Sequence, residues 1–274
     1  YSSSELYPKT NFYYTTNAGI ANHEHVVFLT VKCYPVHYNP AANTLYYSDS
    51  LSINILYETP TNPMAISEEY DLVIIAPEKF TSNLQTLVDH KNSIGMTTLF
   101  KTVEDIYNEY SGRDQPEQIK YFIKDTFDTY GIEYVLLVGG LKSMIYADGR
   151  DDTNQGSKDW YVPVRYTNLY DGGGVQDPGC ISDLYYADLY DGDGNFSSWD
   201  SNDDDIFAAW GKYGVPTDQL DLFPDLYVGR LACRNKIEVN TMVKKIINYE
   251  SGTDPSWFEK MVVIGGDTFD DVAS

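Results

Sequence analysis

Hydrophobic and polar positions alternate along the first 58 residues of the chain, which is the pattern of exposed β-strands. The stretches EHVVFLTVKCYPVHY (24–38) and TLYYSDSLSINILYE (44–58) are rich in β-branched and aromatic residues, and NPAAN (39–43) between them has turn composition. We predict an antiparallel pair of strands within a small sandwich. The next stretch, ETPTNPM (58–64), holds two prolines without periodicity, which indicates a linker.

From Tyr70 onward the pattern becomes one of short continuous apolar runs, which are typical of strands buried on both faces. Between these runs, apolar residues recur at helical spacing. The predicted strands are DLVIIAP (71–77), MTTLFKT (96–102), YVLLVGG (134–140), LYVGRLA (226–232) and KMVVIGGD (260–267).

The helices predicted between these strands have recognisable ends. The first carries Leu84, Leu87, Val88 and Lys91 on one stripe and ends near Gly95. The others are VEDIYNEY (103–110), PEQIKYFIKDTFDTYG (116–131), with Pro116 near its start and Gly131 just past its end, and NKIEVNTMVKKIINYE (235–250).

This alternation predicts an α/β fold with a doubly wound, mostly parallel sheet. We divide the chain into a β-rich segment at 1–68 and an α/β unit at 69–274, which carries an acidic insert at 148–210. A parallel strand is joined to its neighbour by a crossover. We therefore expect the unit to be incomplete at its C-terminal end.

Composition narrows the classes of function. The 274 residues carry 41 acidic against 19 basic side chains, a formal charge of −22, which makes nucleic acids and anionic membranes poor partners. No apolar run is long enough for a membrane span. Three widely spaced cysteines argue against a disulfide framework and a zinc site. The Tyr-rich, lysine-poor chain begins with Tyr1 and not Met, so we expect an exported protein that has lost its N-terminus.

Much of the negative charge falls on one connection. Fourteen aspartates and no glutamate lie between Asp148 and Asp205. Asp191, Asp193 and Asn195 in DGDGN, and Asp200, Asn202 and Asp204 in DSNDD, place side-chain oxygens at alternate positions, as calcium loops do. Neither stretch has the glutamate that an EF-hand places at position 12. The sequence therefore predicts irregular Ca²⁺ sites completed by more distant groups such as Asp183 or Asp188. A solvated acidic loop and Mg²⁺ are the alternatives.

No catalytic centre emerges from the residues themselves. The four histidines do not follow a buried strand in a Gly-flanked loop, and Cys233, after a strand, has no evident histidine partner. The chain also lacks a G-x-S-x-G elbow, a P-loop and a dinucleotide fingerprint. We predict no catalytic residue within it.

Several stretches in order resemble the gingipain-like cysteine peptidases, peptidase family C25 of the caspase-like clan. They are YDLVIIAPEKFTSNLQTLVDHKNSIGMTTLFKTVEDIY, YVLLVGG, SDLYYADLYDGDGNFSSWDSNDDDIF, FPDLYVGRLACRNKIEVNTMVKKIINYE and MVVIGGD, together about residues 70–267. The earlier stretch VFLTVKCYPVHYNPAANTLYYSDSLSINILYE resembles the end of the β-rich propeptide that precedes the catalytic domain in this family.

The resemblance implies a caspase-like pair of α/β subdomains with a catalytic histidine in an HG dipeptide and a catalytic cysteine, both downstream of MVVIGGD. The sequence holds no HG dipeptide, so no catalytic residue carries over. The family's Asp-x-Asn-Gly-Asp-Gly calcium run is matched by Asp200, Asn202 and Asp204. Asp203 and Asp205 stand where glycines are usual, and Ala209 where Glu is often found.

Two hypotheses follow. The first is the N-terminal portion of a secreted or cell-surface cysteine endopeptidase made as a zymogen, acting on protein or peptide substrates. Its partner would be the C-terminal catalytic part of the same precursor, which would stay associated if the chain is cut. The second is a non-catalytic, secreted calcium-binding module for adhesion or cell-surface assembly.

Overall fold

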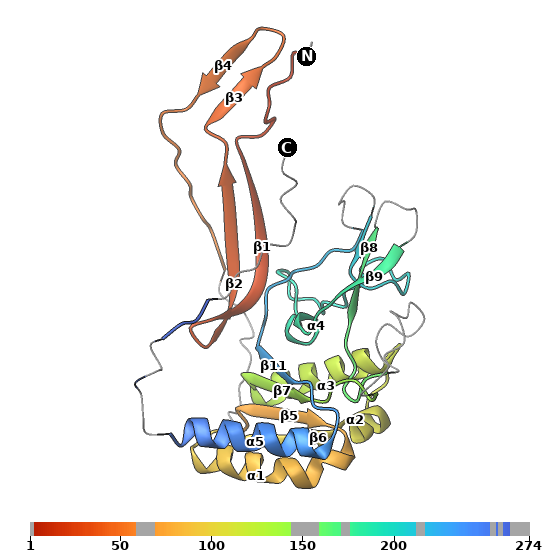
Figure 1. The fold of residues 1–274 in the computed structure, drawn as a ribbon. Coiled ribbons are helices and arrows are strands. Elements are labelled where there is room, and N and C mark those ends of the chain that lie inside the picture. The colour runs from red at the N-terminus through yellow and green to blue at the C-terminus, as the bar shows by residue number, and fades with distance from the viewer. Residues whose placement is uncertain are drawn as a thin grey trace, which may run out of the picture.

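The structure is a computed structural model, and it describes residues 3–58, 69–143, 159–170, 176–211, 217–252, 256 and 260–263. Its centre is a four-stranded sheet in the order β11-β7-β5-β6 (Figure 1), in which every neighbouring pair is parallel. The strands are β5 (Leu72–Ala76), β6 (Thr98–Thr102), β7 (Tyr134–Val138) and β11 (Tyr227–Leu231). The predicted parallel α/β sheet is confirmed.

Helices cover both faces of this sheet, as doubly wound folds require. Alternate residues of β5 point to opposite faces, so Leu72 and Ile74 pack in one apolar cluster while Val73 and Ile75 pack in another. The first cluster is covered by α1 (Thr81–Ser93) and α5 (Lys236–Glu250), and the second by α2 (Val103–Glu109) and α3 (Gln115–Tyr130). A short 3₁₀ turn, η1 (Glu78–Phe80), leads into α1.

The helix ends follow from local sequence. Asp114 caps α3 by accepting the N–H of Glu117, and Asn235 caps α5 by accepting the N–H groups of Ile237 and Glu238. Gly131 ends α3 with φ at 68°, a left-handed conformation in which a Cβ would be unfavourable. The predicted ends of this helix are therefore confirmed, and their physical reasons are the expected ones.

The acidic insert contains regular secondary structure over its described residues, although its aspartates at 193 and 203–205 are exposed. It forms a three-stranded sheet, β10-β8-β9, and a short helix. Its buried aromatic side chains join the core on the α3 side of the main sheet. The elements are β8 (Tyr166–Tyr170), β9 (Gln176–Ile181), α4 (Leu184–Ala187) and β10 (Ala209–Trp210), and the aromatic residues are Tyr185, Tyr186, Trp199 and Phe207.

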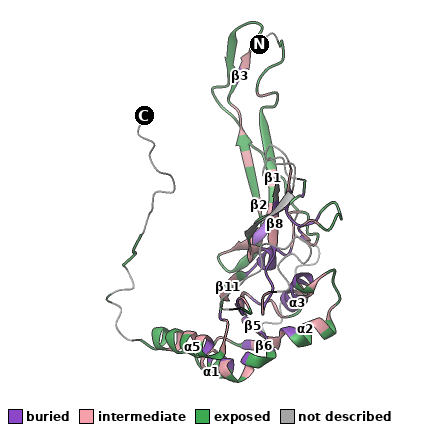
Figure 2. Ribbon diagram, turned by 45° about the vertical axis from the view of Figure 1, so that its right-hand side comes forward, coloured by how far each residue is buried: buried purple, intermediate pink, exposed green. Residues whose placement is uncertain are grey.

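The N-terminal segment consists of two hairpins that project from the α/β unit (Figure 1). A long pair, β1 (Phe12–Ala21) with β2 (Glu24–Cys33), is followed by a short pair, β3 (Val36–Asn39) with β4 (Thr44–Tyr47). Figure 2 shows that most of both hairpins is exposed.

The turn predicted at residues 39–43 is confirmed, because β3 and β4 pair across it. The antiparallel, β-rich character of the segment is also confirmed, but the predicted strand bounds and the sandwich are wrong. β2 pairs with β1, which the sequence did not reveal, and residues 48–58 form no strand. Two separate two-stranded sheets replace the predicted sandwich. The predicted linker beyond Glu58 and the boundary at 68/69 lie outside the described residues.

The predicted strand at 260–267 is not formed over residues 260–263, and its other residues lie outside the described part. Met261, Val262 and Val263 are each more than 80% exposed. A strand buried on both faces needs a paired neighbour and covering helices, and the described residues offer this stretch neither. No helix in the described ranges is long and apolar enough to cross a membrane.

Candidate functional site in the acidic insert

The eight predicted metal ligands do not gather in one place. Asp183 forms a two-pronged ion pair with Arg230, at 2.6 and 2.8 Å from the guanidinium Nε and Nη2. Arg230 also donates to the carbonyl oxygens of Gly139, Val162 and Pro163. Asp183 therefore fixes β11 to the segments around it. Among the described residues, no group of three or more acidic, histidine or cysteine side chains is placed to hold a metal ion.

Asp188 is a core residue. Its Oδ2 accepts the indole N–H of Trp199 at 2.7 Å and the backbone N–H of Leu222 at 3.2 Å, while its Oδ1 is buried without a hydrogen-bond partner. Burial raises the pKa of Asp188, and nearby Lys120 opposes that rise. Lys120 is fully buried, donates to the carbonyl of Ser197, and has its pKa lowered by burial to about 7. In the structure Asp188 therefore accepts hydrogen bonds from Trp199 and Leu222 and lies near the buried ammonium of Lys120.

The first acidic loop is a tight exposed turn around Asp191. One carboxylate oxygen of Asp191 accepts the backbone N–H groups of Asp193 at 3.0 Å and Asn195 at 2.8 Å. Gly194 has φ at 81°, and the side chains of Asp193 and Asn195 are exposed. The second oxygen of Asp191 has only a 3.3 Å contact with the Asn195 amide. The carboxylates and the amide of this loop are therefore accessible to a hydrated cation.

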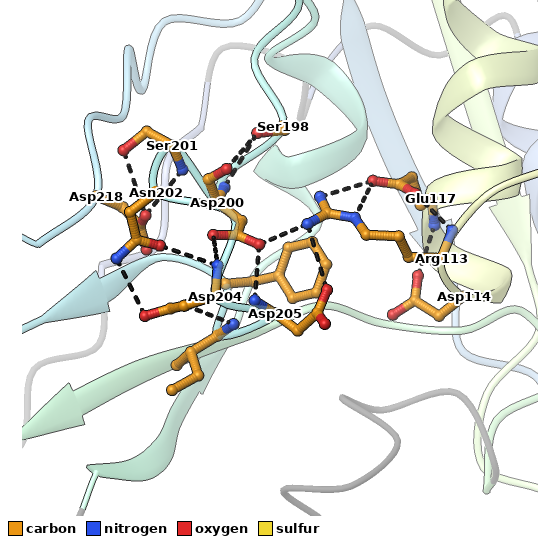
Figure 3. A network of polar contacts seen from close by, with 12 residues as sticks. Arg113, Asp114, Glu117, Ser198, Asp200, Ser201, Asn202, Asp204, Asp205 and Asp218 are labelled. Atoms are coloured by element: carbon orange, nitrogen blue, oxygen red, sulfur yellow. Dashed lines mark hydrogen bonds and ion pairs between the residues drawn. The ribbon is translucent and has the colours of Figure 1, made fainter.

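The second acidic loop is also organised around its first aspartate, Asp200 (Figure 3). Asp200 accepts the backbone N–H groups of Asp204 at 3.1 Å and Asp205 at 2.9 Å. Asn202 accepts the same N–H of Asp204 and donates to its carboxylate at 3.0 Å. Asp203 and Asp205 have φ at 57° and 63°, the left-handed conformation that glycine adopts most easily. These are the two positions where the family resemblance expects glycine.

A cation already lies in this second loop. The Arg113 guanidinium contacts the fully buried carboxylate of Asp200 at 2.5 Å and the exposed carboxylate of Asp205 at 3.6 Å (Figure 3). Glu117, in the first turn of α3, holds the other side of the guanidinium at 2.7 and 2.9 Å. Sequence reasoning missed Arg113, because it lies 87 residues from Asp200 and its position carries no pattern.

Asp218 is a second residue that sequence reasoning missed. It accepts the backbone N–H groups of Ser201 at 2.9 Å and Ala209 at 2.6 Å, so it ties the second loop to β10. Its side chain lies in the same network in Figure 3. Burial raises its pKa, and the backbone donors oppose the rise. Asp218 therefore positions the second loop by accepting hydrogen bonds from backbone N–H groups at its two ends.

The part of the β1–β2 hairpin nearest its turn packs against the insert and the segment before β11. Asp221 accepts the side-chain amide of Asn17 at 2.5 Å and the backbone N–H of Ala18 at 2.8 Å. Buried Asp225 accepts the N–H groups of Leu189 and Tyr190 and lies 2.5 Å from His25. These contacts join the two halves of the described chain.

Other groups complete this contact between hairpin and α/β unit. Ile20 donates its backbone N–H to the carbonyl of Pro224 at 2.8 Å. The rings of Phe28 and Phe223 lie 5.2 Å apart, centroid to centroid, and His23 pairs with Glu133. Backbone, aromatic and charged contacts therefore all hold the hairpin.

We expect the stability of this contact to depend on pH through Asp221. Burial raises the pKa of Asp221 to about 6, although its two hydrogen bonds to Ala18 and Asn17 oppose the rise. An unfolded aspartate titrates near pH 3.9, so between about pH 4 and 6 the folded protein binds a proton that the unfolded chain has lost. The contribution of Asp221 to stability is therefore fully present below pH 4 and is lost as pH rises through 6.

The measurement is urea unfolding at several pH values between 4 and 7 for the wild type and Asp221→Asn. We expect the free energy of unfolding to fall less steeply with rising pH in the variant, which cannot ionise. Equal slopes in the two proteins would contradict the raised pKa of Asp221.

The histidines and cysteines have no catalytic arrangement in the described ranges. His25 and His23 pair with Asp225 and Glu133, His37 contacts the carbonyl of Pro8, and His90 lies 2.9 Å from Glu250. Cys233 is buried, and burial raises the pKa of its thiol. Each histidine therefore has an oxygen partner, and this thiol is held in its unreactive, protonated form.

Comparison with known proteins gives a family match. The model of peptidase family C25 matches residues 65–274. Gingipain R2 of Porphyromonas gingivalis is 24% identical over 218 residues, which are 78% of this chain and 22% of that protein. Gingipain R1 of the same organism is 23% identical over 206 residues, which are 74% of this chain and 15% of that protein. The chain thus spans about a fifth of the length of these curated relatives.

Solved structures of similar proteins match more distantly. The Arg-specific cysteine proteinase gingipain R is 20% identical with a TM-score of 0.38, covering 69% of this chain and 30% of that one. The complex of the pro- and mature domains of Porphyromonas gingivalis RgpB is 22% identical with a TM-score of 0.38, covering 65% and 29%. Dimeric latent PorU from Porphyromonas gingivalis is 17% identical with a TM-score of 0.42, covering 85% and 20%.

Proposed function

This chain belongs to peptidase family C25, and we propose that it is the N-terminal portion of an exported cysteine endopeptidase. The family match over residues 65–274 is the observation that carries the proposal. Residues 1–68 would be part of a propeptide, and residues 69–274 the α/β subdomain that supports the catalytic one. The catalytic histidine and cysteine would lie in the C-terminal part of the same precursor.

In the whole protein, a cysteine thiolate would attack the carbonyl carbon of a peptide bond, and the histidine would protonate the leaving amine. Backbone N–H groups would stabilise the tetrahedral oxyanion. The part described here would act as a scaffold. The Arg230–Asp183 and Arg113–Asp200 pairs tie the insert to the parallel sheet and its connections, and a second subdomain would pack on this unit.

The test is denaturing mass spectrometry of the purified full-length precursor after treatment with a thiol-reactive peptidase probe. We expect the probe on a cysteine beyond Ser274, either in a longer chain or in a second polypeptide that copurifies with this one, and competition by a protein substrate. No substrate-competed labelling of any cysteine would overturn the proposal. It would favour a non-catalytic, secreted calcium-binding module.

We also propose that the first acidic loop binds Ca²⁺ through Asp191, Asp193 and Asn195. The fit rests on accessible carboxylates around a turn whose backbone N–H groups already orient Asp191. Waters and backbone carbonyls would complete the six to eight oxygen ligands that Ca²⁺ takes. Asp183 and Asp188 are outside this proposal, because each is engaged by a partner of its own. A bound ion would stabilise the insert by mass action.

Removal of calcium is expected to lower the melting temperature of the wild type. At free calcium about 100 times the Kd, binding contributes about 2.7 kcal/mol. Asp193→Asn should lose most of the difference between calcium and chelator, whereas Asp49→Asn, an exposed aspartate in the N-terminal segment, should keep it. Differential scanning calorimetry in calcium and in EDTA measures both. A melting temperature insensitive to EDTA would contradict calcium binding here.

A further inference from the structure

We infer that the second acidic loop uses the guanidinium of Arg113 in place of a calcium ion, and that removing Arg113 would turn the loop into a divalent-cation site. The family resemblance implies calcium at Asp200, Asn202 and Asp204, but the residues of this chain do not fit an ion there. The inference concerns the second loop alone and holds whether or not the first loop binds calcium.

Each of the oxygens that an ion would need already accepts a hydrogen bond, and one of them also contacts a cation. Asp200 Oδ1 accepts the N–H of Asp204, and Asp200 Oδ2 accepts both the N–H of Asp205 and Arg113 Nη1. Asn202 Oδ1 accepts the N–H of Asp204, and Asp204 Oδ1 accepts the N–H of Ile206 at 2.9 Å. A calcium ion bound to Asp200 Oδ2 would have to displace Arg113, because the guanidinium contacts that oxygen.

Arg113 is held firmly in this position. Its N–H groups reach Asp200 and Glu117 together, and its guanidinium carbon lies 4.6 Å from the centre of the Phe207 ring. The backbone N–H of Arg113 donates to Glu117 at 2.6 Å. A planar guanidinium can bind two carboxylates and stack on a ring at once, which a spherical ion cannot do.

The charges also balance without a metal. Asp203, Asp204 and Asp205 are exposed, so water screens their charges, whereas the Asp200 carboxylate is fully buried and needs a partner. The positive charge of Arg113 neutralises the negative charge of the buried Asp200 carboxylate. Glu117, the other buried carboxylate that Arg113 contacts, lies in the first turn of α3, where the helix dipole favours a negative charge. The loop therefore has the oxygen spacing of a calcium loop, with one guanidinium against its buried carboxylate.

Arg113→Gln tests the inference. The glutamine leaves Asp200 buried without a cation, and Asp200, Asn202, Asp204 and Asp205 then offer oxygens to an ion. Isothermal titration of the purified chain with CaCl₂ should show one more bound ion in Arg113→Gln than in the wild type. Terbium luminescence excited through Trp199, which precedes Asp200 in the chain, should be stronger in the variant than in the wild type. Arg113→Lys, which keeps the positive charge, should behave like the wild type.

The same calcium stoichiometry in Arg113→Gln and the wild type would overturn the inference, and so would an extra ion in Arg113→Lys. If Arg113→Gln does not fold, Asp204→Asn in the wild-type background decides. Because the second loop holds no ion in the wild type, Asp204→Asn should leave calcium stoichiometry unchanged, and a loss of one ion would overturn the inference. Asp193→Asn separately reports the first loop, so the failure of one proposal is distinguishable from the failure of the other.

Discussion

Replacement of Asp114 by alanine is expected to lower the free energy of unfolding by about 3–5 kcal/mol, the usual cost of removing one partner of a buried ion pair. Asp114 accepts Nη1 and Nη2 of Arg165 at 2.7 and 2.8 Å. The side chain of Arg165 is fully buried, and its Nε already lacks a hydrogen-bond partner. The Phe207 ring, 3.5 Å away, and the Tyr185 hydroxyl would be left to compensate the charge.

Asp114 also caps α3, so the loss of the cap must be separated from the loss of the ion pair. Asn235 caps α5 in the same way without a buried charge beneath it, and Asn235→Ala should cost only about 1 kcal/mol. Asp114→Asn keeps a capping oxygen but not the negative charge, so its cost should lie between those of the two alanine variants. Urea unfolding at pH 7 measures all three. A cost for Asp114→Ala no larger than that for Asn235→Ala would show that Arg165 does not depend on Asp114.

The Asp114–Arg165 pair is a contact that could not be predicted from the sequence. The main sheet was predictable, because strands buried on both faces are continuously apolar, as in LVIIA of β5. The ends of α3 were predictable, because Pro116 and Gly131 act locally. The role of Arg165 was not predictable, because its partner lies 51 residues away in the sequence.

The hairpin β1–β2 was missed for a related reason. The β1 residues Asn17, Ala18 and Gly19 have low strand propensity, and their conformation is fixed by tertiary contacts. Gly19 lies so close to the segment before β11 that a Cβ there would be 3.0 Å from the carbonyl oxygen of Pro224. Glycine is more typical of turns than of strands. In the fold, the absence of a side chain at Gly19 allows β1 to contact the backbone of the segment before β11.

The spacing of the acidic residues identified two stretches that form loops in the structure, but it could not show what surrounds each loop. Spacing alone placed Asp191 and Asp200 each at the start of a loop, and in both loops that first aspartate accepts backbone N–H groups. The difference between the loops lies outside them, in the end of the α2–α3 connection that carries Arg113. The sequence pattern shows the spacing of the loop oxygens, whereas only the tertiary structure shows that Arg113 contacts Asp200.

Replacement of Gly192 by valine is expected to detach the β1–β2 hairpin while leaving the parallel sheet folded. A Cβ at position 192 would lie 2.4 Å from the carbonyl oxygen of Thr16, a backbone atom that no rotamer change can move. The next two residues, Asn17 and Ala18, make the hydrogen bonds to Asp221. Hydrogen bonds to a charged group contribute about 1.5–3 kcal/mol each, so protection of the Ala18 amide against hydrogen exchange should fall by at least about tenfold.

The matched control is Gly229→Ala in β11, where a Cβ would meet only Leu136 at 3.8 Å and no backbone atom. Hydrogen exchange followed by mass spectrometry should show faster exchange over residues 12–33 in Gly192→Val, and unchanged exchange in β5 and β7 in both variants. Detachment with an intact sheet is what a removable propeptide segment requires, because the α/β unit must remain folded after the segment leaves. Loss of protection throughout the chain would instead make the hairpin part of the unit's core, and residues 1–68 could not then be a propeptide that is shed.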